Sequence, residues 1–383
     1  MPDPVKTSRS DRPVLIVGGG VAGLALGWRL LHAGRSVQLF ERDRAGRGAS
    51  WASAGMLAPD AEIGFEDPEL YRLNRESLRR WPAFAKALET ESGMETGFRT
   101  DGAVHVAADR DEAEALRRRY DFMKAQGLDV RWLSPAEALD IEPFITSRPA
   151  AVLYSPSDSQ VDSRALVEAL QASFLKAGGV LREGVAVRAV EPDARTPAVM
   201  TESGERVEGS CVVLATGAWS HGMEGLTADQ KPPVRPVRGQ MMELQSEPPF
   251  DLQHVVRSAH MCVVPKPGGR VLVGTTMEEM GFDARVTAGG LYTILEEARK
   301  IVPGIDDLPV RDIWAGLRPA SRDHLPILGP SSAPGVVMTT GFYRHGMLLA
   351  PVASEEVAQY ILSGETSAWI APFLPGRFET VSA

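Results

Sequence analysis

The chain has 383 residues, of which 44% are hydrophobic and 24% are charged, a composition typical of a globular protein with a substantial core. Its formal net charge of −9 disfavours a nucleic-acid-binding protein, because binding to phosphates requires the opposite sign. The two cysteines, Cys211 and Cys262, lack a C-x-x-C spacing and the seven histidines form no H-x-x-x-H pair, so neither a disulfide framework nor a metal site is expected.

The N-terminal segment, Met1 to Arg12, is polar and contains no apolar stretch of signal-peptide type. No run in the sequence approaches the roughly twenty apolar residues of a membrane span. We therefore expect a cytoplasmic protein with a disordered tail over residues 1–10.

The first strand and turn are the most informative part of the sequence. An apolar run over residues 13–17 precedes a glycine cluster, and a helical pattern follows over residues 22–33. Gly18, Gly20 and Gly23 fit the spacing G-x-G-x-x-G. Between a strand and a helix, such glycines allow a tight turn, a close approach of backbone to a pyrophosphate, and close packing of the helix on the sheet. The pattern predicts dinucleotide binding; the alternative is a glycine-rich turn in an unrelated α/β unit.

A second apolar strand, residues 36–40, ends in Glu41, whose carboxylate can accept hydrogen bonds from a ribose. The following loop, residues 45–59, consists largely of small side chains. Trp51 and Met56 make this loop too apolar for a flexible linker, so we expect it to contact a cofactor.

The middle of the chain alternates between helical and extended patterns. Helical periodicity marks residues 67–90, 111–126 and 162–177, and a Ser-x-x-Glu capping box predicts a helix that begins at Ser134. Strands are expected at residues 103–107, 130–133, 150–154, 185–190 and 210–216. The last of these ends in Ala-Thr-Gly at Gly217, which is typical of a second turn that contacts a nucleotide.

Residues 234–310 are rich in strand patterns and end in a helix over residues 290–302, which indicates an antiparallel sheet inserted into the nucleotide-binding domain. Two further strands and a closing helix follow. The expected fold class is α/β, a Rossmann-like domain with an antiparallel-sheet substrate-binding domain. The expected boundaries are residues 11–85, 150–233 and 311–370 for the Rossmann-like domain, and residues 86–149 and 234–310 for the substrate-binding domain.

Four stretches carry a resemblance to a known family: the glycine fingerprint with Glu41, residues 52–59 (ASAGMLAP), residues 314–319 (WAGLRP) and residues 341–351 (GFYRHGMLLAP). Together they resemble the glycine oxidase and D-amino-acid oxidase group of FAD-dependent amine oxidases, in the superfamily that includes sarcosine oxidases, and glycine oxidases most closely. They follow the family's order and span nearly the whole chain. The resemblance implies that the Rossmann-like domain binds FAD.

The resemblance also assigns residues to the adenosine and diphosphate parts of FAD. Glu41 and Arg42 would hold the ribose and its surroundings, residues 49–50 would line the diphosphate, and Val187 would contact the adenine side through its backbone. The complete set of expected FAD contacts is Gly18, Gly20, Gly23, Glu41, Arg42, Ala49, Ser50, Ala54, Gly55, Met56, Val187, Gly217, Phe342, Arg344, His345, Gly346, Met347 and Leu348.

On the flavin side, residues 54–56 would lie against the ring system, and residues 342–348 would close over it. Sarcosine oxidases of the same fold attach their flavin through a cysteine. Neither Cys211 nor Cys262 lies in the loop of residues 318–330, where that link would be expected. FAD is therefore expected to be bound non-covalently.

Oxidation of a small amino acid by a flavin requires a grip on the carboxylate, because the C–H bond must be oriented toward the cofactor. Arg318 suits this catalytic role, since a guanidinium binds a carboxylate bidentately; the alternative is a surface salt bridge. Arg344 is the second candidate, with a structural hydrogen bond to loop carbonyls as its alternative. His345, where relatives carry asparagine, is expected either at the edge of the flavin or simply packed.

The substrate pocket is expected to include Met56, Met261, Cys262 and Met277, although methionines are also ordinary core residues. Similar glycine oxidases carry a tyrosine at the position of Cys262. Replacing an aromatic ring by a thiol opens space and removes a hydroxyl group. We therefore expect a wider, apolar pocket that accepts a nitrogen substituent, and a substrate of the N-carboxymethyl (N-substituted glycine) type rather than glycine. A reactive thiol is the alternative for Cys262.

The expected activity is that of an FAD-dependent amine oxidoreductase that acts on a small amine with a free carboxylate, uses O₂, and yields glyoxylate, an amine and H₂O₂. Four alternatives remain open: a dehydrogenase with a non-oxygen acceptor, a D-amino-acid oxidase, a flavin-holding scaffold without turnover, and a nicotinamide-dependent dehydrogenase. Neither a nucleic acid nor a membrane is an expected partner, and the sequence leaves a homo-oligomer open.

Overall fold

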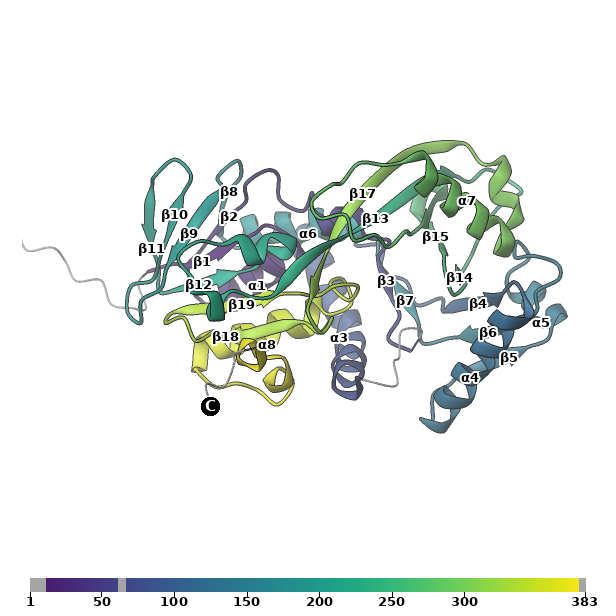
Figure 1. Ribbon diagram of the computed structural model, residues 1–383, viewed down its shortest axis with the longest axis horizontal. Helices are drawn as coiled ribbons and strands as arrows, with labels where there is room; N and C mark the ends of the chain where they lie inside the picture. The colour runs from purple at the N-terminus through teal and green to yellow at the C-terminus, as the bar shows by residue number, and fades with distance from the viewer. Residues whose placement is uncertain (1–11, 61–66, 379–383) are drawn as a thin grey trace, which may run out of the picture.

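The computed structural model describes residues 12–60 and 67–378. The tail expected over residues 1–10 lies outside the described residues. Two large sheets occupy opposite ends of the molecule, and the long strands β13 (Val234–Gln245) and β17 (Val310–Ser321) run between them (Figure 1).

The first sheet has six strands in the order β18-β19-β12-β1-β2-β8. In sequence order these are β1 (Val14–Val17), β2 (Val37–Phe40), β8 (Val180–Arg182), β12 (Cys211–Leu214), β18 (Ile327–Pro330) and β19 (Val336–Thr340). All neighbours run parallel except β18 and β19. The predicted Rossmann-like architecture is therefore confirmed.

Both faces of the first sheet are covered, which is why its central strands are apolar throughout. One face shares a core with four helices: α1 (Val21–His32), α3 (Pro68–Ser92), α6 (Ser163–Lys176) and α8 (Ala350–Ser363). The other face packs against a three-stranded sheet made of β9 (Val187–Glu191), β10 (Ala198–Thr201) and β11 (Arg206–Glu208).

The second sheet has eight strands in the order β17-β13-β16-β15-β14-β4-β6-β5. Its remaining members are β4 (Ala103–Ala107), β5 (Arg131–Leu133), β6 (Ala151–Ser155), β14 (Val255–Arg257), β15 (Cys262–Lys266) and β16 (Arg270–Gly274). Helices α5 (Pro135–Ile141) and α7 (Ala288–Ile301) cover one face, and α4 (Arg110–Ala125) packs near β6. Residues from the loop that follows β2 lie on the opposite face.

Strand pairing differs from the expected domain boundaries at two places. Strands β6 and β17, both expected in the Rossmann-like domain, belong to the eight-stranded sheet, where β6 pairs with β4 and β5 and β17 pairs with β13. The sheet is also not wholly antiparallel, since β14 runs parallel to β4. These pairings join strands that are far apart in the sequence, so local pattern does not reveal them.

The loop expected over residues 45–59 contains a short helix, α2 (Ala49–Ala52), and a short strand, β3 (Met56–Leu57), which pairs with β7 (Ser159–Gln160). The capping box at Ser134 is confirmed, because Ser134 N donates to Glu137 Oε2 at 2.8 Å and Glu137 N donates to Ser134 Oγ at 3.3 Å. Within residues 12–60 and 67–378, no helix is both long enough and apolar enough to cross a membrane.

Candidate active site

The glycine fingerprint forms a turn that only glycines allow. Gly18 has a φ of 110°, and a Cβ at this position would overlap Ala215 O at the end of β12. A Cβ at Gly23 would overlap Gly18 O, so any side chain there would push α1 away from the turn. Gly20 is the N-cap of α1, and a helix N-terminus suits a phosphate group because its first N–H groups have no partner within the helix. Side chains at Gly18 and Gly23 would distort the turn, and the glycine backbone at the start of α1 fits the diphosphate of a dinucleotide.

Most of the residues predicted around the ribose and diphosphate gather at this turn. Glu41 Oε2 accepts a hydrogen bond from Gly19 N at 2.8 Å, which holds the carboxylate beside the glycines. Ser50 Oγ accepts from Val21 N at 3.0 Å and so ties α2 to the start of α1. The Arg42 guanidinium lies 3.7 Å from the ring centroid of Trp219.

Two further predicted contacts lie on either side of the turn. Gly217, with a φ of 53°, follows β12, the parallel neighbour of β1. Val187 begins β9, two residues after Val185, whose N–H donates to Glu41 O at 2.9 Å. Both therefore flank the strand ends where a dinucleotide binds in this kind of fold.

On the flavin side, a small cavity of about 50 Å³ brings two distant segments together. Its lining residues are Ser53, Ala54, Gly55, Met56, Ala58, Arg344, His345 and Leu348. The sequence predicted FAD contacts in both segments, and the structure places them around one cavity. The side chains of Phe342 and Met347, by contrast, are buried in the core beneath the first sheet.

Arg318 lies on β17 next to the second of these segments, because Tyr343 N donates to Pro319 O at 2.8 Å. Its guanidinium donates from Nη2 to Thr275 Oγ1 at 2.8 Å and from Nη1 to Thr276 O at 3.2 Å. It lies directly over Gly239 of β13, where a Cβ would overlap it. Arg318 is therefore held in place rather than extended into solvent.

A pair of glycines shapes this part of the sheet. Gly239 lies opposite Gly316 on the neighbouring strand, and a Cβ at Gly316 would stand 2.5 Å from the Cβ of Ala52. The first glycine leaves room for the Arg318 guanidinium, and the second lets α2 lie flat on β17. Trp314 Nε1 donates to Ala52 O at 3.1 Å and fixes the same contact. The sequence analysis did not identify Gly239, whose requirement appears only in the paired strands.

Cys262 is buried on the face of the sheet that carries this loop. It packs in one cluster with Trp51, Ala54 and Met56, and its Sγ donates to Gly274 O at 3.0 Å. The predicted placement of Met261 beside it is wrong. Met261 points to the opposite face, into the core shared with α5 and α7, because successive strand residues alternate between faces.

Met277 lies at the rim of the site and not within a closed pocket. Its side chain is 60% exposed, and the Tyr343 hydroxyl lies 2.7 Å from its Sδ. Met280 and Phe282 in the same loop are also exposed. Of these residues, Met277 borders the site near Arg318, because it follows Thr276, whose carbonyl accepts from Arg318 Nη1.

Lys266, which the sequence analysis did not single out, lies behind the flavin-side loop. Its Nζ donates to Val161 O at 2.8 Å and to Gln160 Oε1 at 3.0 Å, next to Gly55. Burial lowers the pKa of this ammonium to about 7. The lysine thus connects β15 to β7, which pairs with β3. It therefore stabilises the flavin-side loop that contains β3.

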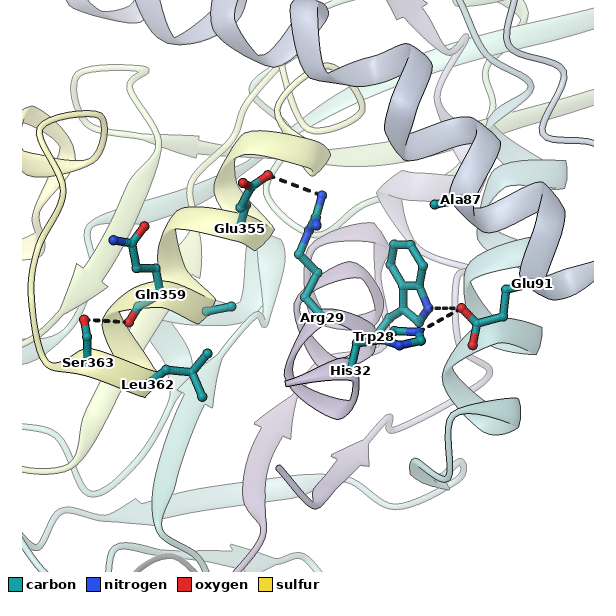
Figure 2. A pocket seen from close by; sticks show the side chains of 10 residues that line it. Trp28, Arg29, His32, Ala87, Glu91, Glu355, Gln359, Leu362 and Ser363 are labelled. Carbon is teal, nitrogen blue, oxygen red and sulfur yellow. Dashed lines mark hydrogen bonds and ion pairs between the residues drawn. The ribbon is translucent and has the colours of Figure 1, made fainter. Parts of the chain in front are cut away.

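A wider hollow of about 560 Å³ lies on another part of the surface, between α1, α3 and α8 (Figure 2). Trp28 and His32 reach Glu91 across it, and Arg29 pairs with Glu355 at its edge. None of the residues predicted for FAD or substrate lines this hollow, so it is not the active site.

Comparison with known proteins agrees with this site. The model of the DAO family, described as FAD dependent oxidoreductases, matches residues 13–360. The chain belongs to this family. The glycine oxidase of Geobacillus kaustophilus is 35% identical over 96% of this chain and 97% of its own length.

Solved structures give the same result. The crystal structure of the Geobacillus kaustophilus glycine oxidase superposes with a TM-score of 0.89, at 33% identity, over 97% of this chain and 99% of its own. An iminodiacetate oxidase from Chelativorans sp. BNC1 superposes with a TM-score of 0.84, at 26% identity, over 94% and 98%. The predicted fold, the FAD cofactor and the class of FAD-dependent amine oxidoreductase are thereby confirmed.

Proposed function

We propose that this chain is an oxidase of the glycine-oxidase type that acts on N-substituted, N-carboxymethyl-type glycines in preference to glycine. It oxidises the C–N bond to an imine, which water hydrolyses to glyoxylate and an amine, and electrons pass to O₂ to give H₂O₂. The support comes from the family, from similarity to glycine oxidases over nearly the full length, and from the placement of Arg318 beside the flavin-side cavity.

Bound FAD supplies the acceptor for the hydride of the α-carbon. Residues 54–56 and 344–348 hold its ring system from two sides, and the chain has no cysteine in residues 318–330, so the attachment is non-covalent. Arg318 binds the substrate carboxylate in a fixed orientation, because Thr275 and Thr276 already fix two of its N–H groups. Arg344, on the cavity wall, assists at the substrate or at the flavin.

The proposal of an N-substituted substrate rests on the position of Cys262. It lies on the face that meets Ala54 and Met56, next to Gly274, the residue before the threonine that holds Arg318. A nitrogen substituent on a substrate gripped by Arg318 therefore extends past a thiol rather than a phenol ring. The similarity to a protein named as an iminodiacetate oxidase supports this substrate class, since iminodiacetate is itself an N-carboxymethyl glycine.

We also propose that the six-stranded sheet with its helices binds FAD, and that the eight-stranded sheet provides the roof over the substrate. In this division β6 and β17 go with the substrate-binding part. In this division Arg318 belongs to the substrate-binding part and Gly18 belongs to the FAD-binding part.

Release of H₂O₂ and glyoxylate from the purified holoenzyme tests the proposal. The substrates are glycine, sarcosine, D-alanine, iminodiacetate and glycines with longer nitrogen substituents. Faster turnover of the N-substituted glycines supports the proposed preference, whereas faster turnover of glycine or D-alanine contradicts it. Bleaching of the flavin without H₂O₂ identifies a dehydrogenase. Flavin that remains attached to the denatured chain contradicts non-covalent binding.

A further inference from the structure

Lys266 is a buried basic residue whose hydrogen-bond acceptors are both neutral. It is the last residue of β15 and is 5% exposed. Its Nζ donates to the carbonyl oxygen of Val161 at 2.8 Å and to Oε1 of Gln160 at 3.0 Å. Within the described part of the chain, no carboxylate forms an ion pair with it. Buried charges in proteins are ordinarily paired, so this lysine requires an explanation.

The charged groups nearest to Lys266 neutralise one another. Asp162, at the start of α6, accepts from Arg270 Nη1 at 2.6 Å. Glu243 of β13 accepts from Arg270 Nε at 3.2 Å and from Arg164 Nη1 at 3.0 Å. This network of two carboxylates and two guanidinium groups is balanced in itself and leaves the charge of Lys266 uncompensated. The other titratable groups that act on it are Cys262 on its own strand and Arg99, which pairs with Asp101 at 2.6 Å.

A single layer of backbone separates the Lys266 side chain from the cavity proposed for the flavin ring. Gln160 of β7 pairs with Met56 of β3, and Val161 N donates to Gly55 O at 2.8 Å. Met56 and Gly55 both line that cavity. A Cβ at Gly55 would stand 3.3 Å from Lys266 Nζ. The charge of the lysine therefore acts on the cavity across Gly55, in a buried region where charges interact more strongly than in water.

The hydrogen bonds of Lys266 suit its charged and its neutral form equally. An ammonium has three N–H donors and a neutral amine has two, and both forms can satisfy the two acceptors. Burial lowers the pKa of this group to about 7. Near neutral pH, added negative charge in the cavity therefore shifts the lysine toward its protonated form. The side chain can gain or lose its proton and keep both hydrogen bonds.

We propose that Lys266 raises the reduction potential of the bound FAD and takes up one proton from solvent at Nζ when the flavin is reduced. This inference rests on the proposed function, in which Gly55 and Met56 lie against the flavin ring. In turnover the two electrons come from the substrate as hydride, and the lysine releases its proton when O₂ removes them. Because it acts across Gly55, Lys266 is a positioning residue and not a catalytic one.

The test measures the midpoint potential of bound FAD in the holoenzyme by spectroelectrochemical titration without substrate, over a range of pH. At about pH 6 the lysine is protonated in both redox states, so it contributes fully to the potential. As the pH rises above the pKa of about 7, the oxidised protein loses the proton first. The contribution of Lys266 therefore declines and is lost by about pH 9.

Lys266→Met removes the charge. At about pH 6 and a fixed potential we expect the ratio of reduced to oxidised FAD to fall about tenfold, which is about 30 mV for a two-electron couple. At about pH 9 the variant should match the wild type. Lys266→Arg carries a charge that does not titrate, so it should keep the higher potential at every pH. Lys176→Met, which removes an exposed lysine from the end of α6, should follow the wild type.

Gln160→Glu neutralises the charge and leaves the lysine in place. Gln160 Nε2 is buried and has no hydrogen-bond partner among the described residues, so its replacement by oxygen breaks no hydrogen bond there. A carboxylate at this position pairs with Lys266, and the pair has no net charge. The potential at about pH 6 should therefore fall to that of Lys266→Met. This variant decides the question if Lys266→Met fails to fold or to retain FAD.

Wild-type potentials at about pH 6 in Lys266→Met or Gln160→Glu overturn the inference, as does a potential in Lys266→Arg as low as that in Lys266→Met. Turnover of N-substituted glycines separates this inference from the proposed function. If these amines are oxidised but the potentials do not differ, the proposed function stands and the inference is wrong. If the potentials differ as expected but no amine is oxidised, the inference stands and the proposed function is wrong.

Discussion

The glycine turn and the substrate-facing row of the large sheet are built in opposite ways. The turn comes from one stretch of the sequence, since Gly18, Gly23 and Glu41 all belong to the segment that contains β1, α1 and β2. The row joins Arg318 of β17 and Cys262 of β15, which the register of the eight-stranded sheet brings onto one face. The comparison teaches that the turn proposed to bind the cofactor follows from one sequence motif, whereas the face proposed to meet the substrate follows from pairing between distant segments.

The largest effect is expected at the row, from Arg318→Met. Loss of a held guanidinium that pairs with a buried carboxylate costs about 4 kcal/mol, or roughly a thousandfold in kcat/KM. The measurement is the rate of flavin reduction without oxygen, with the FAD content of the variant determined separately. We expect FAD binding to survive, because the cofactor cradle lies in the other sheet.

Arg311→Met is the matched control, since Arg311 lies on the same strand but is exposed; its Nη1 donates to Gln245 Oε1 at 2.8 Å and its Nε lies 3.9 Å from Glu243 Oε1. It should keep the wild-type rate. Equal losses in both variants contradict a specific role for Arg318 and indicate a general effect on β17.

Gly18→Ala is expected to impair FAD binding, the property that Arg318→Met leaves intact. The added Cβ overlaps Ala215 O at a φ of 110°, so the turn must open, with a cost of about 3 kcal/mol in the free energy of unfolding and a loss of bound FAD. Gly34→Ala provides the control, because Gly34 also has a positive φ, 79°, but no atom within 4 Å of the added Cβ. Its cost is about 1 kcal/mol, and FAD remains bound.

The two glycine variants are compared by thermal unfolding and by the ratio of flavin to protein absorbance. Similar effects of Gly18→Ala and Gly34→Ala would show that conformational strain alone matters and that the close approach to β12 does not.

The same contrast explains what the sequence could predict. Gly18, Glu41, most of the helices and the capping box at Ser134 could all be predicted from the sequence, because each belongs to a motif or periodicity with a fixed spacing along the chain. The correct face for Cys262 was also available locally, since alternation in a strand places Met261 on the opposite face.

The pairings of the large sheet could not be predicted in this way. Nothing near β6 or β17 indicates which strands they join, and only the fold brings Cys262 beside Gly274, Trp51 and Met56. Lys266 reads as an ordinary surface lysine until the structure buries it against Gln160 and Val161. Strand register and side-chain burial are properties of the whole fold, and they determine which side chains lie together on the large sheet and how far each one is exposed.

Cys262→Tyr tests whether the small side chain of Cys262 leaves space for the nitrogen substituent of the substrate. A phenol ring fills the space beside Gly274 and Met56, so the preference for N-substituted glycines over glycine should fall by about one to two orders of magnitude, a size typical of steric discrimination in a pocket. The measurement is the ratio of kcat/KM for the two substrates. Met261→Leu, one residue away on the other face, should leave this ratio unchanged; an equal change in both variants contradicts the assigned faces.

The last prediction concerns the pH dependence of stability. The raised pKa of Asp158, about 7, means that the folded protein keeps a proton between about pH 4 and pH 7 that the unfolded chain has released. Stability therefore falls as the pH rises through this range, by up to about 1.4 kcal/mol per pH unit from this group. Asp158→Asn carries no such group, so its stability relative to the wild type should increase from pH 5 to pH 7 and level off above about pH 8.

Denaturant unfolding at several pH values measures this difference, and Asp111→Asn, at an exposed acid of α4, should follow the wild-type profile. A flat difference between Asp158→Asn and the wild type would show that this carboxyl titrates normally and that its surroundings beside His105 are open to water.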